Sequence, residues 1–433
     1  MDRSLAMEKK VEIISKRLIK PEVCHVESFN FSALDQLAPP AHYPIFLYYT
    51  HDQESTNLST RSLQLESSLS KILVDFYPFA GRLTNDNTSI SCNYHKDDDF
   101  GVLFVEAFAH NYNLQEDILL SGNKTKGQFV PTLDSLLQTH LLIVQVTLFE
   151  CGGMILGCWV SHKLSDATSI CTFINNWASM ARGANISMSS IPDFKMGIKV
   201  FPPTKQPSPL PFANLVDQDQ SVSKIFLFDG PSIANLKSKA LSKVVPSPTR
   251  VEAVTALLWK CFTVSSGTSN LSHVVNVRKR LVPSLPNGTI GNFLAFLMAT
   301  KSESDNNDLP NLVTILRKGL LEFPYSKNDT KSLNWNVALD PILGNWNMFG
   351  DLLSRSRDIE LYHFTSWCGV PFYEADFGWG KPKWMSIMEL YYKNTILLMD
   401  AKDGGIEAWV CLEAKHMSEF EQNQELLAFA TIK

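Results

Sequence analysis

The chain has 433 residues, which is long enough for two or three domains with a large buried core. Hydrophobic residues make up 45% of it and charged residues 19%, a balance typical of an ordinary globular protein in water. The formal net charge is −5 and no basic run is longer than a short piece, so the composition disfavours nucleic acid as the main partner.

The cysteines and the two ends of the chain indicate the cellular compartment of the protein. The eight cysteines form no CxxC pair and several lie within apolar runs, so we expect reduced core residues in a cytoplasmic protein. Residues 1–20 are charged and carry no secretory signal, and the last four residues match no lipidation or peroxisomal signal. Polar residues and glycines interrupt the apolar run at 141–160, so we expect no membrane span and no membrane partner.

The first 109 residues predict strands on either side of one long helix. Residues 11–20 alternate loosely and end at a proline, which favours an edge strand. Residues 45–49 and 101–109 predict two further strands. Residues 59–76 predict a helix, because apolar side chains recur on one face at helical spacing. These side chains are Leu65, Leu69, Ile72 and Phe76.

A predicted hairpin leads into a predicted helix in the middle of the chain. Residues 141–149 and 154–160 predict two buried strands, and Gly152 and Gly153 favour a tight turn between them. After residue 166 the apolar spacing becomes helical and ends at Gly183. The sequence therefore places His162 at a junction between a strand and a helix, where a side chain can face a cleft.

A histidine at such a junction can act as a general base. Neutral imidazole accepts a proton near pH 7, provided that a neighbour holds the ring in one tautomer. Asp166, four residues further on, is a candidate for that neighbour, and it is equally a candidate N-cap for the following helix. A metal site is the third possibility, but no second cluster of histidine or cysteine supports it, so we expect no metal.

The prolines and polar residues between 202 and 223 predict a linker, so we expect an N-terminal domain over 1–201 and a C-terminal domain over 224–433. In the second domain, residues 224–228 and 273–278 predict strands, and residues 231–241 predict a helix. Another helix is predicted to begin at Thr249, which would be its N-cap with Glu252 in the capping-box position.

The C-terminal region predicts a loop, a hairpin and a last helix. Glycines and a proline at 375–382 favour the loop. The hairpin is predicted over 395–412, and a single amphipathic helix over 417–427. The chain has no G-x-S-x-G, Walker A or G-x-G-x-x-G motif, which removes the main support for hydrolase, NTPase and dinucleotide-binding functions.

Four motifs occur in a specific order. They are YPFAGR at 77–82, HKLSD at 162–166, NVR at 276–278 and DFGWGKP at 376–382. In this order the chain resembles the plant BAHD acyl-CoA-dependent acyltransferases along its full length, and most of all the branch of alkaloid O-acetyltransferases that contains vinorine synthase. It departs from the usual motifs at Ala167, where the family has glycine, and at Val277, where it has leucine.

The resemblance implies an α/β fold of two similar chloramphenicol-acetyltransferase-like domains, each a mixed β-sheet flanked by helices. It implies a tunnel between them, which acyl-CoA enters from one side and the acceptor from the other. It also implies a monomer that needs no metal. The implied partners are acyl-CoA, with acetyl-CoA as the expected donor, and a small hydroxylated metabolite.

The resemblance also implies roles for individual residues. His162 corresponds to the general base, and Asp166 to an aspartate that turns away and pairs with an arginine, for which Arg278 is the candidate. Asp376 corresponds to a residue sometimes counted as a second catalytic group. Gly378, Trp379 and Gly380 would support the site structurally. The positions near CoA are Thr249, Arg250, Ser366 and Trp367.

The expected function is acetyl transfer from acetyl-CoA to a hydroxyl of an alkaloid, terpenoid or acyl sugar, with His162 as general base and no covalent intermediate. One alternative is the same fold with another donor, such as a benzoyl, hydroxycinnamoyl or branched acyl group, or with an amine acceptor. The second alternative is a non-catalytic relative that binds a metabolite, because a fold alone does not fix a function.

Overall fold

The computed structural model describes residues 8–23, 28–50, 58–92, 100–119, 129, 139–184, 190–205, 210, 221–262, 267–321, 336–356, 358–388 and 392–433. The chain divides into two compact units. Unit 1 comprises Met1–Pro207, Pro286–Asn292 and Val370–Met388, and unit 2 comprises Ser208–Leu285, Phe293–Gly369 and Glu389–Lys433. Most of the predicted linker at 202–223 lies outside the described residues.

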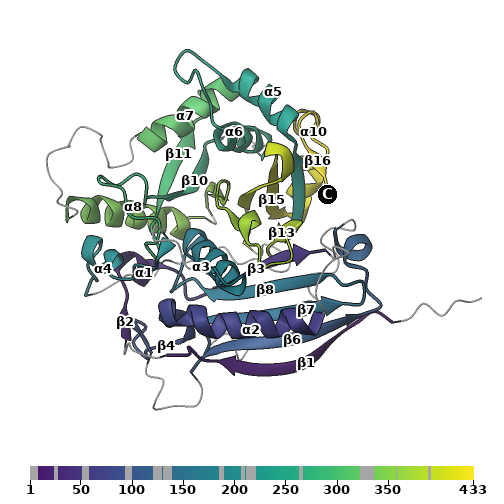
Figure 1. Ribbon diagram of the computed structural model, residues 1–433. Helices are drawn as coiled ribbons and strands as arrows, with labels where there is room; N and C mark the ends of the chain where they lie inside the picture. The colour runs from purple at the N-terminus through teal and green to yellow at the C-terminus, as the bar shows by residue number, and fades with distance from the viewer. Residues whose placement is uncertain are drawn as a thin grey trace, which may run out of the picture. The chain divides into compact units, whose positions relative to one another are not determined.

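In the described part of unit 1, six strands form a mixed sheet in the order β1-β6-β7-β8-β3-β13 (Figure 1). Their bounds are β1 Lys10–Ile19, β3 His42–Tyr49, β6 Val102–His110, β7 Leu142–Phe149, β8 Met154–Ser161 and β13 Trp384–Ser386. The β6–β7 pair is parallel, and the other pairs are antiparallel. The predicted edge strand and hairpin are confirmed as β1 and β7–β8, with Gly152 at φ 81° in the turn.

Two long helices, α2 (Leu58–Asp75) and α3 (Ala167–Ala181), pack against each other in front of this sheet (Figure 1). Both confirm the predicted helical spacing. Trp177 of α3 is fully buried, and its indole N–H donates to the Ser68 hydroxyl at 3.0 Å. Because a buried indole needs a hydrogen-bond acceptor, this contact fixes how the two helices meet.

Smaller elements complete the described part of unit 1. A three-stranded sheet has the order β2-β5-β4, with β2 Ser28–Asn30, β4 Arg82–Leu83 and β5 Ser89–Ser91. Short helical segments are α1 Ala33–Leu37, η1 Tyr77–Ala80, η2 Leu114–Leu119, α4 Met196–Val200 and η6 Phe372–Glu374. The YPFAGR motif covers η1 and the first residue of β4, and it joins α2 to the small sheet.

In the described part of unit 2, seven strands form a mixed sheet in the order β11-β10-β12-β14-β15-β9-β16. Their bounds are β9 Ser221–Phe228, β10 Ser269–Asn276, β11 Leu294–Lys301, β12 Glu360–Ser366, β14 Thr395–Asp400, β15 Ile406–Glu413 and β16 Thr431–Ile432. β12 runs parallel to both β10 and β14, and the other pairs are antiparallel.

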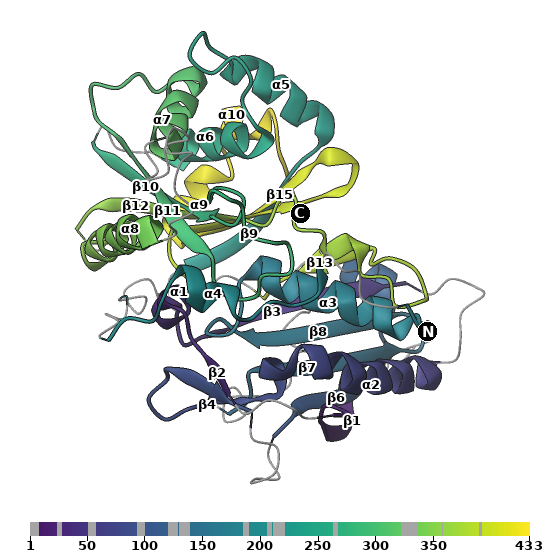
Figure 2. The ribbon, with the colours of Figure 1, turned by 60° about the vertical axis from the view of Figure 1, so that its left-hand side comes forward.

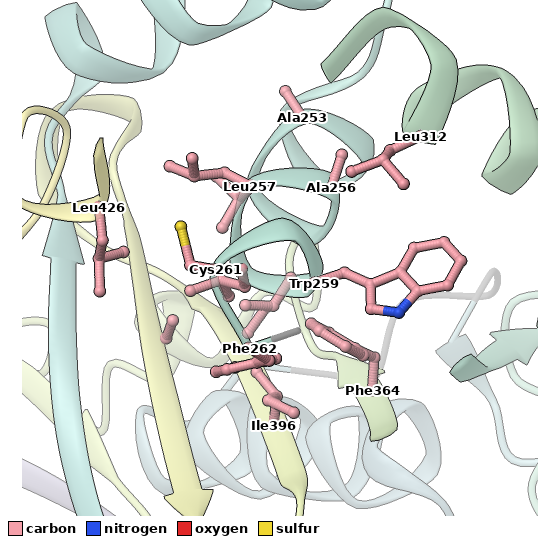
Figure 3. Packing of buried hydrophobic residues seen from close by; sticks show 14 of the residues in the cluster. Ala253, Ala256, Leu257, Trp259, Cys261, Phe262, Leu312, Phe364, Ile396 and Leu426 are labelled. Atoms are coloured by element: carbon pink, nitrogen blue, oxygen red, sulfur yellow. The ribbon is translucent and has the colours of Figure 1, made fainter. Parts of the chain in front are cut away.

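Helices cover both faces of this sheet. The bounds are α5 Gly230–Ala240, α6 Arg250–Phe262, α7 Leu309–Leu321, α8 Asn336–Ser354, η7 Lys402–Gly404, α9 Ala414–Phe420 and α10 Gln424–Leu427. Helices α5, α6, α7, α9 and α10 contribute to the apolar core, and Leu297 is buried in it. Figure 3 shows the part of this core around α6, where Leu257 and Phe262 pack. Phe296, the residue before Leu297 in β11, stacks on Phe349 of α8, with 3.7 Å between the ring centroids. Successive strand residues face opposite sides, so α8 covers the second face, beside β11 in Figure 2.

The start of α6 confirms the predicted capping box. The Thr249 hydroxyl accepts from the Glu252 N–H at 3.1 Å, and the Glu252 carboxylate accepts from the Thr249 N–H at 2.8 Å. Arg317 of α7 also binds this carboxylate through its Nη2 at 2.6 Å. The cap therefore joins two helices of unit 2.

Two expectations differ from the structure. Residues 376–380 were expected in the C-terminal domain, but their contacts place them in unit 1, because β13 pairs with β3. The single helix predicted over 417–427 is wrong. The Asn423 side chain accepts from the Glu425 and Leu426 N–H groups, which ends α9 and starts α10. Among the described residues, no helix has both the length and the apolarity needed to cross a membrane.

Candidate active site

The strand-to-helix junction at His162 is confirmed. β8 ends at Ser161, and the His162 N–H donates to the Ala41 carbonyl at 2.8 Å, next to the start of β3. The chain then turns and enters α3 at Ala167. The Asp166 side chain accepts from the Ser169 N–H at 2.9 Å and so caps α3. The imidazole is therefore fixed between a strand end and a capped helix, and it stays partly exposed.

Within unit 1, the His162 ring contacts Asn292 and Tyr43. His162 Nδ1 lies 3.0 Å from Asn292 Oδ1, and Asn292 Nδ2 donates to the His162 carbonyl at 2.8 Å. The Tyr43 ring packs against the imidazole at 5.1 Å between centroids, and the Tyr43 hydroxyl donates to the Ser165 carbonyl at 3.1 Å. Together with the bond to the Ala41 carbonyl, three hydrogen bonds and one ring contact thus hold His162.

Asn292 is in turn held by Asp35 of α1. Asp35 Oδ1 accepts from the Asn292 backbone N–H at 2.7 Å and from Asn292 Nδ2 at 3.0 Å. Its other oxygen accepts from the Ser32 hydroxyl at 2.6 Å and the Ser32 N–H at 3.1 Å. Asn292 and Asp35 are 1% and 2% exposed, so both residues that support His162 are buried.

The surroundings favour a neutral His162. Burial lowers the pKa of His162 below the ordinary value of 6.5, although its own backbone, the Asp166 charge and the Asn292 bond act in the opposite direction. A lowered pKa leaves the imidazole unprotonated at pH 7, and this is the form that can accept a proton.

The two possible roles of Asp166 can now be compared. The partner of His162 Nδ1 in unit 1 is Asn292, whereas Asp166 acts as an N-cap. The predicted pairing of Asp166 with Arg278 stays a prediction. Within unit 2, the Arg278 N–H donates to Asn276 Oδ1 at 3.0 Å, and its guanidinium lies 4.5 Å from the centroid of the Phe293 ring.

Asp376 organises its own loop. Its Oδ1 accepts from the Gly378 and Gly380 N–H groups at 2.8 and 3.0 Å, and both glycines have positive φ, at 114° and 93°. Side chains with a Cβ rarely adopt such angles, so these glycines suit the turn. Trp379 is buried, and its ring stacks on Phe377 at 5.7 Å.

The loop is also anchored to the rest of unit 1. Gln64 of α2 donates to the carbonyls of Ala181 and Phe377 at 2.7 and 3.1 Å. The buried Tyr49 hydroxyl donates to the Ala375 carbonyl at 2.7 Å. The structural role of Gly378, Trp379 and Gly380 stays a prediction. A catalytic role for Asp376 stays a prediction.

The residues predicted near CoA lie at the start of α6 and at the end of β12 in unit 2. Arg250 Nη2 pairs with Asp400 Oδ1 at 3.0 Å, and Asp400 Oδ2 accepts from the Gly369 N–H at 2.6 Å. Three residues before Gly369, the Ser366 hydroxyl accepts from the Cys368 N–H at 3.2 Å. The Trp367 N–H donates to the Leu398 carbonyl at 2.8 Å. Asp400 thus links Arg250, at the start of α6, to Gly369, three residues after β12 ends at Ser366.

Sequence reasoning gave no role to Asn292 or Asp35. Ser32 and Asp35 have the spacing of a capping box, which the structure shows at α1, but that pattern predicts only a helix start. Nothing local in the sequence predicts a bond between Asp35 and a residue 257 positions away. Among the described residues, no group of three or more histidine, cysteine, aspartate or glutamate side chains could hold a metal ion.

Comparison with solved structures shows what this fold is similar to. Vinorine synthase matches with a TM-score of 0.81 at 30% identity, over 97% of this chain and 98% of that one. F. sporotrichioides TRI101, solved with coenzyme A and T-2, matches with a TM-score of 0.71 at 17% identity, over 94% of this chain and 100% of that one. The fold is the two-domain α/β fold of vinorine synthase, with mixed sheets flanked by helices, as expected.

Comparison of sequences gives the family. The Transferase family model matches residues 9–427. Akuammiline synthase 1 of Alstonia scholaris is 34% identical over 97% of both chains, and limonoid 1-O-acetyltransferase of Citrus sinensis is 35% identical over 97% and 98%. BAHD acyltransferase BIA1 of Arabidopsis thaliana is 34% identical over 98% and 99%. The chain belongs to the Transferase family, the BAHD acyltransferases, and it is an acyltransferase.

Proposed function

We propose that the protein transfers an acetyl group from acetyl-CoA to a hydroxyl of an alkaloid or terpenoid, with His162 as general base. The observation that carries the catalytic part is the His162–Asn292 contact. It holds a neutral imidazole by Nδ1 and leaves Nε2 as the nitrogen that can take a proton.

The reaction proceeds without a covalent intermediate on the enzyme. His162 Nε2 takes the hydroxyl proton while the acceptor oxygen attacks the thioester carbonyl, which gives a tetrahedral intermediate. The carbon–sulfur bond then breaks, and the CoA thiolate receives the proton from His162. General-base catalysis contributes about 10²–10⁴-fold, and the positioning of donor and acceptor contributes the remainder of the rate.

The names of the relatives support the donor and the acceptor class. Limonoid 1-O-acetyltransferase and stemmadenine O-acetyltransferase are named for acetyl transfer to oxygen, and the TRI101 structure contains coenzyme A. Thr249, Arg250, Ser366 and Trp367 are our candidates for the CoA side. The family resemblance assigns these positions, and Asp400 ties the Arg250 guanidinium to the Gly369 N–H, three residues after Ser366. We also propose, from the sequence, a cytoplasmic monomer.

The test is thiol release from a panel of acyl-CoAs, with and without hydroxylated alkaloids and terpenoids. We expect release that requires acetyl-CoA together with an acceptor. His162→Ala should lower it by at least about 10²-fold with an unchanged melting temperature. The matched control is His110→Ala, because His110 is an exposed histidine of the same unit that pairs with Glu12.

Each outcome separates the alternatives. Release only with benzoyl, hydroxycinnamoyl or branched donors would overturn the acetyl assignment, and an amide product would overturn the hydroxyl acceptor. Full activity in folded His162→Ala would overturn the role of His162. Stabilisation by metabolites with no thiol release from any donor would favour a metabolite-binding relative.

A further inference from the structure

We propose that Asp35 is a positioning residue, which locks the Asn292 amide in one orientation and so keeps the His162 proton on Nδ1. This inference rests on the proposed role of His162. Asp35 does not touch the imidazole, and it acts through Asn292.

The Asn292 amide has one acceptor and two donor hydrogens, and both hydrogens are in use. One is donated to Asp35 Oδ1 at 3.0 Å and the other to the His162 carbonyl at 2.8 Å. The ionised Asp35 carboxylate and the His162 carbonyl oxygen can only accept hydrogen bonds. If the amide turned over, its own oxygen would face these two acceptors and both bonds would be lost inside a dry site. Unmade buried bonds are costly, so one orientation is favoured.

The fixed amide determines the histidine tautomer. Asn292 Oδ1 carries no hydrogen and lies 3.0 Å from His162 Nδ1, so a bond requires the hydrogen on Nδ1. A neutral imidazole has one ring hydrogen, which leaves the lone pair on Nε2. The position of the basic nitrogen thus depends on a carboxylate two hydrogen bonds away.

The contacts of Asp35 fit an ionised carboxylate. Its four partners are the N–H groups of Ser32 and Asn292, the Ser32 hydroxyl and Asn292 Nδ2, and all four donate to it. The Ser32 hydroxyl oxygen accepts from the Asp35 N–H at 3.2 Å through a lone pair, so the hydroxyl hydrogen can be donated to the carboxylate. Burial raises the pKa of Asp35, and these bonds act against that rise. The buried Lys163, whose ammonium donates to the Gln36 carbonyl at 2.7 Å, adds a nearby positive charge.

The rival explanation is that Asp35 only caps α1. Two alanine variants separate the roles, because Ser32 and Asp35 share the capping box but only Asp35 binds Asn292. Ser32→Ala loses the hydroxyl and keeps the Asp35–Asn292 bonds. Asp35→Ala loses both. In Asp35→Asn, the new amide oxygen can still accept from Asn292 in one of its two orientations.

We expect Asp35→Ala to lower kcat by about 10–100-fold with little change in KM, by analogy with removal of the outer partner of a metal-binding histidine. Asp35→Asn should recover part of this loss, and Ser32→Ala should stay within a few-fold of the wild type. Equal losses in Ser32→Ala and Asp35→Ala would overturn the proposal in favour of capping.

A measurement without turnover keeps this test independent of the proposed function. The full chain is labelled with ¹⁵N-histidine, and the His162 signals are assigned by their loss in His162→Gln. The ring-nitrogen shifts at a pH where His162 is neutral then report the tautomer. We expect hydrogen on Nδ1 in the wild type and in Ser32→Ala, and a mixture of tautomers in Asp35→Ala.

Hydrogen on Nε2 in the wild type would overturn the inference even if no variant folds. The tautomer is measured without turnover, whereas the role of His162 as general base is tested by the activity of His162→Ala. The failure of this inference can therefore be distinguished from the failure of the proposed function. A folded Asp35→Ala with the wild-type tautomer and the wild-type kcat would also overturn it.

Discussion

His162 and Asn292 are 130 positions apart in the chain and are joined by two hydrogen bonds, one at each end of the Asn292 amide. One bond reaches the imidazole and the other reaches the His162 carbonyl. The ring and its backbone are therefore held by the same residue. The segment Pro286–Asn292, which belongs to unit 1 although the chain around it belongs to unit 2, is thus part of the support for the proposed base.

The pH dependence of the rate should reflect the lowered pKa of His162. Burial disfavours the charged ring, so the neutral base persists to lower pH than free histidine and is lost as the pH falls through its pKa. We expect the acid limb of kcat/KM, which reports the free enzyme, to lie below 6.5. A limb at or above 6.5 would contradict the pKa direction.

Variants of Asp166 should separate its cap from its predicted charge pair. Asp166→Ala removes the bond to the Ser169 N–H, which is worth about 0.5–2 kcal/mol, whereas asparagine is as good a cap. If Asp166 pairs with Arg278 as predicted, Asp166→Asn should still cost about 3–5 kcal/mol, because it leaves a buried charge unpaired.

Urea unfolding of the single variants Asp166→Asn and Arg278→Met and of the double variant gives the coupling free energy between Asp166 and Arg278. We expect the double variant to lose less than the sum of the two single losses. Wild-type stability in Asp166→Asn, together with a loss of about 1 kcal/mol in Asp166→Ala, would contradict the charge pair. Asp166 would then stabilise the protein only as the N-cap of α3.

Variants of Asp376 should show whether it supports the loop or takes part in the reaction. Asp376→Ala removes two accepted N–H bonds and should cost about 1–3 kcal/mol with a lower rate. Asp376→Asn keeps an oxygen that can accept both bonds, so we expect near wild-type melting and activity. A stable Asp376→Asn that has lost about 10²-fold or more in kcat would show that the charge itself is needed for catalysis.

The glycine of the YPFAGR motif should be needed for close approach. A Cβ at Gly81 would lie 2.3 Å from Ile90 Cγ2 and 2.7 Å from the Ser91 carbonyl oxygen. Gly81→Ala should therefore destabilise the protein by about 1–3 kcal/mol, as overpacking does. The matched control is Gly344→Ala in the middle of α8, where a Cβ meets nothing within 4 Å.

This control should stabilise the protein by about 0.5–1 kcal/mol, because alanine is the better helix former. Both changes are read by urea unfolding. Equal and small effects at the two positions would show that the backbone around Gly81 can shift to make room.

Local patterns in the sequence predicted the local structure well. The apolar spacing of α3, the paired glycines between β7 and β8, and the Thr249–Glu252 cap are each confirmed. Each depends on residues within a few positions of one another. The one wrong helix, over 417–427, failed at Asn423, whose capping side chain outweighed a continuous apolar spacing.

The family, the fold class and the placement of His162 were thus determined by the sequence, because motifs and periodicity depend on short-range order along the chain. Only the tertiary structure decided what holds the imidazole. Asp35, His162 and Asn292 come from three separate segments, and their bonds span 130 and 257 positions. The bonds between them depend on which strands pair and which segment crosses from one unit to the other. Such long-range hydrogen bonds are geometric consequences of the whole fold and leave no periodic signal in the sequence.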